Sequence, residues 1–168
     1  MEEVLIKTQI PQTLQIPQIG HTADDADNDN YADENQRNQR MRSMTENEIS
    51  YKIRGCIFNV YNKLGPGLLE SAYEAALKIE LEKAGCMVKT QVYLPMIYDG
   101  VRVEKAYRID MLIEDKVIVE LKAVSQMNEI WFKQLMTYLK MTGLKLGLLV
   151  NFETNNIDKS IYRRVNGL

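Results

Sequence analysis

Two runs of alternating apolar and polar residues, separated by Glu114-Asp115-Lys116, restrict the fold of this chain more than any other feature. Alternation over about four to eight residues predicts a strand with one buried face, and a short polar connection joins two such strands into a hairpin. The apolar residues at alternate positions are Ile109, Met111, Ile113, Val117, Val119 and Leu121. The segment from Tyr107 to Ala123 is therefore predicted to be an antiparallel hairpin with one face against a core.

The shared apolar face also fixes the register of this hairpin. Residues directly opposite each other in an antiparallel pair point to the same side of the sheet. The three-residue turn pairs Ile113 with Val117, so that Asp110 stands opposite Glu120. Lys122 lies two residues further on and points to the same side. The pattern predicts two carboxylates and an ammonium group on one face.

The residues alone leave two interpretations of Asp110, Glu120 and Lys122 open. In the first, they form the solvated face of a half-buried hairpin, where the lysine neutralises two acids. In the second, the carboxylates supply the hard oxygen ligands that Mg²⁺ prefers. The lysine would then stabilise a water-derived nucleophile or the charge that develops on a phosphate.

Helical periodicity and further strands surround this hairpin. Thr45-Glu46-Asn47-Glu48 matches the capping box that begins a helix, and Gly65-Pro66-Gly67 ends that helix. Helices are expected at roughly 45–64, 68–84, 127–142 and 157–165, and strands at roughly 86–94, 96–113 with a turn at Asp99-Gly100, 117–124 and 144–151. This order predicts an α/β fold, a mixed β-sheet flanked by helices.

Residues 1–43 differ in kind from residues 44–168. The first segment has few large apolar residues after Ile19, so it cannot bury enough surface to offset the entropy of ordering. We therefore expect a disordered polar N-terminal tail at 1–43 and one folded domain at 44–168. The tail carries eight acidic and four basic residues, and the chain as a whole has a net charge of −2, which leaves the domain near +2. A mildly basic domain suits a polyanionic partner.

Several classes of protein are excluded by what the chain lacks. It has no run of about 18 apolar residues and no secretory signal after Met1, so we expect a cytoplasmic protein that does not span a membrane. The two cysteines, Cys56 and Cys86, are not arranged as a disulfide framework or a zinc site. The single histidine, His21, lies in the tail. Any hydrolytic chemistry must therefore use carboxylates, lysine and metal.

Three motifs carry a resemblance to a known family. Gly67-Leu-Leu-Glu70-Ser-Ala-Tyr73 matches GxxExxY, Asp110 followed by Glu120-Leu121-Lys122 is similar to D…ExK, and Gln134-Leu-Met-Thr-Tyr138 is similar to QxxxY. In this order, over residues 48–160, they resemble the GxxExxY family of the PD-(D/E)XK nuclease-like superfamily. The chain departs from the pattern at Ile109, where the name of the superfamily has proline.

The resemblance implies a restriction-endonuclease-like fold and a phosphodiesterase that depends on Mg²⁺ or Mn²⁺ and acts on nucleic acid, with DNA favoured over RNA. Asp110 and Glu120 would bind the metal together with the Leu121 carbonyl, and Lys122 would assist the nucleophile. Glu70 would reach in from its helix as an additional ligand or base.

For the third motif, the resemblance implies that Gln134 and Tyr138 contact substrate phosphate or orient the site, since residues four apart share a helix face. The apolar stripe that docks the same helix is expected to be structural: Trp131, Leu135 and Leu139.

Two rival hypotheses belong to other classes. A non-catalytic nucleic-acid-binding or protein-binding module could retain the nuclease fold, and an interaction protein could act through the acidic tail if that tail folds on binding. Bound divalent metal at Asp110 and Glu120 would favour the enzyme, and deletion of residues 1–43 would test the tail. The sequence fixes neither the polarity of cleavage nor the oligomeric state.

Overall fold

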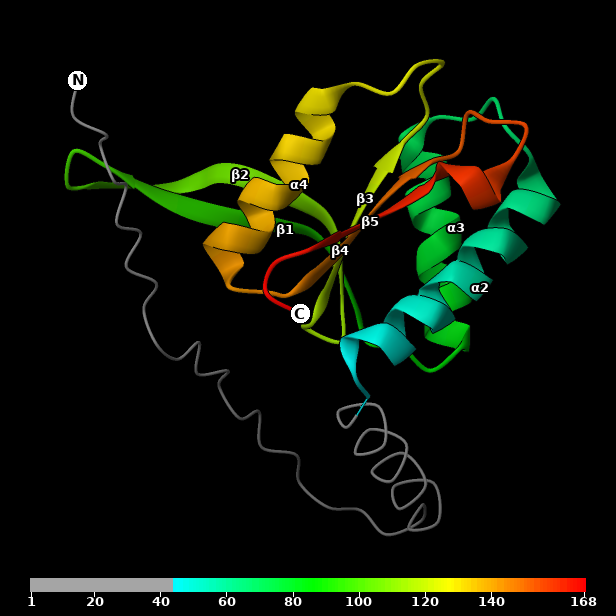
Figure 1. Ribbon diagram of the computed structural model, residues 1–168, viewed down its shortest axis with the longest axis horizontal. Coiled ribbons are helices and arrows are strands. Elements are labelled where there is room, and N and C mark those ends of the chain that lie inside the picture. Colours follow the sequence, from blue (N-terminus) through cyan, green and yellow to red (C-terminus); the bar gives the residue numbers. More distant parts are fainter. Residues whose placement is uncertain (1–43) are drawn as a thin grey trace, which may run out of the picture.

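A five-stranded mixed sheet forms the middle of the protein, which we describe from a computed structural model for residues 44–168 (Figure 1). The predicted disorder of residues 1–43 lies outside the described residues. The elements in chain order are α2 (Glu46–Leu64), α3 (Glu70–Lys83), β1 (Val88–Tyr98), β2 (Val101–Ile113), β3 (Val117–Lys122), α4 (Glu129–Thr142), β4 (Leu146–Asn151), η1 (Ile157–Ser160) and β5 (Ile161–Val165).

The strands lie side by side in the order of the sequence, from β1 to β5. β3 and β4 are parallel, and the other neighbours are antiparallel. The chain passes from β3 to β4 through α4, as a parallel pair requires. The mixed sheet flanked by helices that was predicted from the sequence is confirmed.

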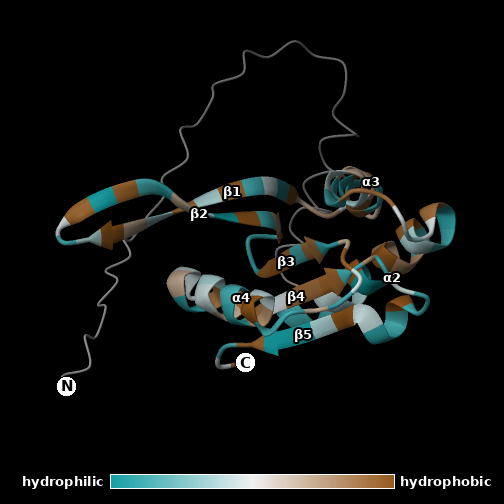
Figure 2. Ribbon diagram, turned by 90° about the horizontal axis from the view of Figure 1, so that it is seen from above, coloured by the Kyte–Doolittle hydropathy of each residue, from teal (hydrophilic) through white to brown (hydrophobic). Residues whose placement is uncertain are grey.

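Two apolar clusters hold helices to opposite faces of the sheet, and Figure 2 shows apolar strands between the helices. In the first cluster, α2 and α3 contribute residues such as Ile53 and Leu77 to a core with β3 and β4. In the second, α4 packs Leu135 and Leu139 against Leu149 of β4. The predicted structural role of the α4 stripe is confirmed, with Trp131 partly buried beside it.

Local sequence signals set the ends of the helices. The capping box of Thr45 and Glu48 is present at the start of α2, with both reciprocal hydrogen bonds. Asn128 caps α4, and Gly143 ends it with a left-handed backbone (φ 72°) that glycine adopts without steric cost. Among residues 44–168, no helix combines the length and apolarity that a bilayer crossing requires.

The C-terminal segment differs from the prediction. A basic helix at 157–165 was expected, but only the 3₁₀ helix η1 forms there, and Ile161–Val165 is the edge strand β5. Tyr162 and Arg164, two residues apart, both contact Phe132 of α4, which is the two-residue period of a strand. The segment pairs antiparallel with β4, and this tertiary partner overrides the short helical pattern.

The predicted hairpin register is confirmed at the three paired positions that join β2 and β3, including Ile113 with Val117. The predicted face of Ile109 is wrong, because Ile109 packs in the second cluster with α4 while Met111 packs in the first. β2 and β1 are paired on both sides of Asp110 and Gln91, but these two residues are not themselves a pair of the ladder. Gln91 has a positive φ of 53°. The strand thus changes its buried face at Asp110.

Beyond this point β1 and β2 continue as a two-stranded ribbon that projects from the body of the protein (Figures 1 and 2). We call residues 93–108 the arm. Leu94 and Tyr107 anchor its base to α4 through the second cluster. Toward the tip, Tyr98 and Val101 are exposed on either side of the turn at Asp99-Gly100.

Candidate functional site

The GxxExxY motif joins a short loop to the first turn of α3 and fixes where that helix begins. Tyr73 is buried and stacks on Phe152 with ring centroids 4.2 Å apart. Its hydroxyl donates to the Gly65 carbonyl at 2.7 Å and accepts from the Leu68 amide at 3.1 Å. Gly67 has a φ of +97°, which favours glycine. Tyr73 therefore has a structural role, since it holds the loop that places the first turn of α3.

Two glutamates of α3 point from this first turn toward the sheet. Glu70 Oε1 accepts a hydrogen bond from the Ala123 amide at 3.3 Å, just after β3. One turn later, Glu74 Oε2 accepts from the Gln91 side chain at 2.5 Å. Burial raises the pKa of Glu74, the bond from Gln91 opposes this, and the nearby Asp110 carboxylate adds to the rise. The sequence analysis singled out Glu70 and missed Glu74.

Asp110 and Glu120 extend the hairpin through side chains where the regular pairing ends. The Asp110 amide donates to Glu120 Oε1 at 3.2 Å, and the Leu121 amide donates to Asp110 Oδ2 at 3.0 Å. Each carboxylate is therefore fixed by the backbone of the opposite strand. The two acids lie next to each other, as the register argument predicted.

Lys122 lies beside this pair. Its Nζ is 3.9 Å from Asp110 Oδ2 and donates a hydrogen bond to the Leu121 carbonyl at 2.7 Å. The Lys122 side chain is 12% exposed and that of Asp110 is 19% exposed, so their interaction is less screened than a surface ion pair. The structure brings the three residues of the D…ExK motif together.

Glu120 is the most buried acid of the group, with 2% of its surface exposed. Burial and then the Asp110 carboxylate raise the pKa of Glu120 to about 8, and Lys122 opposes the shift. A buried carboxylate beside another carboxylate is costly to ionise unless a cation compensates it. A divalent cation would supply that compensation.

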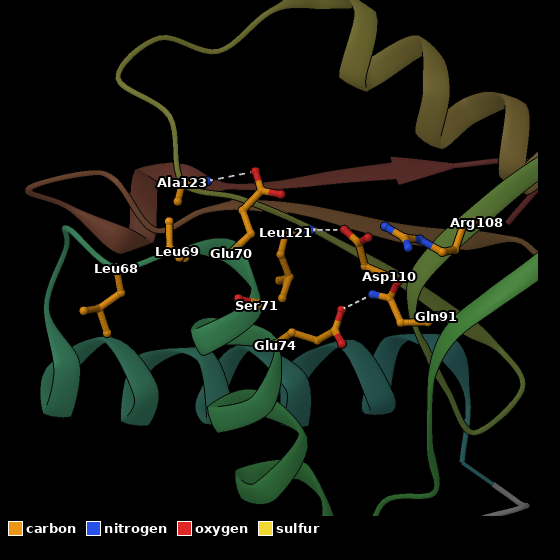
Figure 3. Close-up of a pocket in the computed structure, with 10 residues that line it drawn as sticks. All are labelled: Leu68, Leu69, Glu70, Ser71, Glu74, Gln91, Arg108, Asp110, Leu121 and Ala123. Carbon is orange, nitrogen blue, oxygen red and sulfur yellow. Dashed lines mark hydrogen bonds between the residues drawn. The ribbon is translucent and has the colours of Figure 1, made fainter.

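An open pocket of about 620 Å³ lies between α3 and the hairpin (Figure 3). Asp110, Glu70 and Glu74 line it, and Arg108 extends toward Asp110. Glu120 and Lys122 are not part of the lining. The two carboxylates and the ammonium group predicted to share one face therefore do not share one open pocket, and Asp110 links the pocket to the buried Glu120.

The oxygen donors of the site fit a hard cation in part. Two adjacent carboxylates and the Leu121 carbonyl are the oxygen ligands that Mg²⁺ accepts, and Mg²⁺ keeps several waters when one or two carboxylates bind it. Within residues 44–168, however, no group of three acids, histidines or cysteines is close enough to hold a metal. The predicted ligand Glu70 is not assembled with the other two.

Gln134 and Tyr138 meet each other on α4, as their spacing predicted. Gln134 Nε2 donates to the Tyr138 hydroxyl at 2.5 Å. Burial raises the pKa of Tyr138, the bond from Gln134 opposes this, and the carboxylates of Glu120 and Asp110 contribute to the rise. Tyr138 is 2% exposed, so its hydroxyl presents almost no surface to solvent, and its link to the two acids is electrostatic.

Asn151 is a further residue of the site that the sequence analysis missed. It is buried at the end of β4, paired with Lys122 of β3. Its Oδ1 accepts from the Val124 amide at 3.0 Å, and its Nδ2 donates to the Val124 carbonyl at 2.8 Å. Asn151 thus fixes the chain just after the lysine. Asn151 is the one polar residue of β4 (Leu146–Asn151) and stands at its end. This position is the sequence feature that could have indicated it.

Comparison with known families agrees with this geometry. A model of the PD-(D/E)XK nuclease superfamily matches residues 47–165, which include both helices before the sheet and all five strands. The chain belongs to the PD-(D/E)XK nuclease superfamily, and its fold is the restriction-endonuclease-like α/β fold. No match of significance was found among curated proteins or among solved structures.

Proposed function

We propose that this protein is a metal-dependent phosphodiesterase that cleaves nucleic acid. Membership of the superfamily suggests nuclease activity, and nucleases of this superfamily generally use divalent metals. The observation that carries the proposal is the pair of adjacent carboxylates, Asp110 and Glu120, fixed by backbone amides beside the Lys122 ammonium. Such a pair is electrostatically unfavourable without a cation, and a preorganised site of this kind is typical of function.

Asp110 and Glu120 would hold Mg²⁺ or Mn²⁺ together with the Leu121 carbonyl. When bound, the ion would activate a water and stabilise charge on the phosphate. Lys122 would leave the Leu121 carbonyl, which it binds at 2.7 Å, and direct its ammonium group to the nucleophile or the phosphate.

The other motif residues have supporting roles in this proposal. Glu70, at the first turn of α3, would act as an additional ligand or base after leaving the Ala123 amide. Gln134 and Tyr138 would orient the acids from the α4 side. The GxxExxY loop, with its Tyr73 lock, supports membership of the GxxExxY family within the superfamily.

The substrate of the proposal is nucleic acid, with DNA favoured over RNA. Arg108 lines the pocket beside Asp110 and provides a planar cation for a phosphate group. An acidic pocket needs such a cation, because its carboxylates alone repel the phosphate backbone.

A non-catalytic binding module is the alternative, and one observation favours it. Within residues 44–168 the acids do not gather into a group of three, and Lys122 occupies the backbone carbonyl that a metal would need. A module of this kind would bind nucleic acid through the same fold without turnover.

Cleavage assays decide between the two functions. Labelled single-stranded, duplex and branched substrates are incubated with Mg²⁺ or Mn²⁺, and products are compared for the wild type and Asp110→Ala. Asp115→Asn, in the exposed turn of the same hairpin, removes the same charge away from the site and is the control, since asparagine tolerates the positive φ of 53° there. Metal-dependent products that Asp110→Ala abolishes and Asp115→Asn retains support the enzyme. Binding without cleavage of any substrate supports the module.

A further inference from the structure

The arm exposes aromatic side chains to solvent at its base and at its tip. Tyr93 is 47% exposed and Tyr98 is 72% exposed. Tyr93 stands opposite Arg108 in the β1–β2 pairing, and the Lys105 Nζ lies 5.0 Å from the centroid of the Tyr93 ring. An exposed aromatic ring thus contacts one cation, and its partner position on β2 carries a second one.

Among residues 44–168, the cations beside Tyr93 form no close ion pairs, although Arg108 is near enough to Glu74 to lower the pKa of that acid. The arm has two acidic and three basic residues, and one basic residue, Arg102, is paired with Glu104 at 2.7 Å. Over the part of the chain that the structure describes, neither Lys105 nor Arg108 forms an ion pair. This leaves positive charge on an exposed surface, which is complementary to a polyanion.

This surface is continuous with the candidate site. Arg108 belongs both to the arm and to the lining of the pocket, and Asp110 follows it by two residues on β2. At about 3.3 Å per residue, Lys105 lies about 16 Å along the strand from Asp110. A chain of phosphates that contacts Lys105 and Arg108 in turn would therefore arrive at the Asp110 carboxylate.

We propose that the arm binds a single strand of nucleic acid and directs it into the pocket. Lys105 and Arg108 bind successive phosphates, and Tyr93 and Tyr98 stack on bases. The strand is single because an aromatic face can stack only on a base that is not paired within a duplex. The inference rests on the proposed function for its choice of substrate, and it adds where on the protein that substrate lies.

A second copy of this chain is the rival occupant of the arm. The tip has exposed apolar residues, Ile97, Val101 and Val103, that could pack in a dimer. An apolar contact does not explain why Lys105 lies over the exposed Tyr93 ring without an ion pair to any described residue, nor why this surface leads to the pocket. We therefore favour the nucleic acid and include self-association in the test.

The test measures binding in EDTA, so that cleavage does not interfere. Fluorescence anisotropy with the full chain follows labelled oligothymidine and oligouridine of about 20 nucleotides and a duplex of the same length, a range suited to single-strand binding surfaces. The arm variants are Tyr93→Ala with Lys105→Ala, and Tyr98→Ala. Tyr51→Ala with Lys83→Ala is the control, because it removes an exposed ring (82% exposed at Tyr51) and an exposed cation from a separate groove at α2 and the end of α3.

The double arm variant is expected to bind the single strands at least about tenfold more weakly, and Tyr98→Ala about fivefold more weakly, because each loses base stacking. When the logarithm of the binding constant is plotted against the logarithm of the salt concentration, the slope for the double variant should be shallower by about 0.7. This is the value for one lost phosphate contact on a single strand. The control should bind as the wild type does. Weaker binding of both oligothymidine and oligouridine supports the inference. Weaker binding of only one of them also supports it and shows whether the arm binds DNA or RNA. Melting curves check that all variants fold.

Three results would overturn the inference. They are wild-type affinity in the arm variants, an equal loss of duplex affinity, and absence of single-strand binding by the wild type. Sedimentation that shows a wild-type dimer lost in the arm variants, with unchanged affinity for the strand, assigns the arm to self-association instead. Cleavage is scored separately: a protein that binds through the arm and never cleaves refutes the proposed function alone, and one that cleaves with a dispensable arm refutes this inference alone.

Discussion

The two halves of β2 differ in almost every physical respect. The inner half, Ile109–Ile113, lies between β1 and β3 and is buried against helices on both faces of the sheet. The outer half, 101–108, pairs only with β1 within the arm and is largely exposed. Asp110 is the second residue of the inner half. The strand thus joins a rigid support for the carboxylates to a surface open to solvent.

This contrast suggests that the inner half contributes to the stability of the fold and that the outer half serves the proposed binding. Buried apolar area and paired backbone groups give the inner half its contribution to folding. The exposed residues of the outer half contribute little to the free energy of unfolding. Contacts with a partner can therefore determine which side chains stand there. Substitutions in the two halves should therefore change different measurements.

The largest effect is expected for Glu120→Gln, in the inner region. Glutamine keeps the size of the side chain, and its carbonyl oxygen can still accept the hydrogen bond from the Asp110 backbone amide. It lacks the charge that a hard cation needs. Metal-dependent cleavage should fall by a hundredfold or more, about 3 kcal/mol or greater in the activation barrier. Cleavage rates at saturating Mg²⁺ measure this.

Melting curves of the same variant with and without Mg²⁺ separate the proposal from a purely structural role. Above about pH 8, where Glu120 ionises beside Asp110 and the two charges repel, the variant without metal should melt at the wild-type temperature or higher. Stabilisation by Mg²⁺ should be present in the wild type and absent in the variant. If Lys122 only neutralises the acids, the variant should be slightly less stable and Mg²⁺ should change neither protein. Asp115→Asn, in the exposed turn, is the control.

The next effect is a dependence of stability on pH. The pKa of Glu120 is about 8 in the folded protein, against an ordinary value of 4.5 for a glutamate. Between these values the unfolded chain has released a proton that the folded protein still holds, so stability is fully present at low pH and falls as pH rises. The slope is at most about 1.4 kcal/mol per pH unit. Urea unfolding in EDTA at about pH 5 to pH 8 measures it.

Glu120→Gln has no proton to exchange at this position, so the difference between the wild type and the variant isolates Glu120 from other groups such as Glu74. The free energy of unfolding of the wild type should decline relative to that of the variant as pH rises. Parallel profiles would mean that Glu120 ionises normally in the folded protein, and the argument from burial would then be wrong.

A third prediction concerns packing under the inner region. A Cβ added at Gly147 of β4 would lie 2.6 Å from Leu135 Cδ1 of α4. Gly147→Ala should therefore lower the free energy of unfolding by about 1–3 kcal/mol, as overpacking does. Gly55→Ala on α2 is the control, since a Cβ there meets nothing within 4 Å and alanine favours a helix. Equal stability of the two variants in urea would contradict a tightly packed α4.

The sequence predicted best what depends on neighbouring residues. The capping box at Thr45 and the register between Ile113 and Val117 follow from local hydrogen bonding and from the two-residue period of a strand. The same register brought Asp110 and Glu120 together before any tertiary information was needed.

What the sequence missed depends on partners far along the chain. Ile109 changes face where the partner strand β1 has a left-handed residue, Gln91 (φ 53°), about 20 residues earlier in the chain. The strand β5 forms because it pairs with the edge of β4. The five residues of β5 by themselves do not predict this pairing. Glu74 shares a helix face with Glu70, but only the docking of α3 against β1 brings it to the pocket.

The smallest effect is expected in the outer half, for Val101→Thr. Val101 is 64% exposed at the start of β2, and threonine has a similar shape and strand propensity. The added hydroxyl is solvated there, so the free energy of unfolding should change by less than about 0.5 kcal/mol. The matched substitution Val119→Thr in β3 places the same hydroxyl in a fully buried apolar site, where it should cost about 1–3 kcal/mol. Urea unfolding of both variants compares the two regions directly. A cost at Val101 close to that at Val119 would mean that the arm is packed against another surface in solution, and the exposed ribbon would then no longer be available to bind a nucleic acid strand.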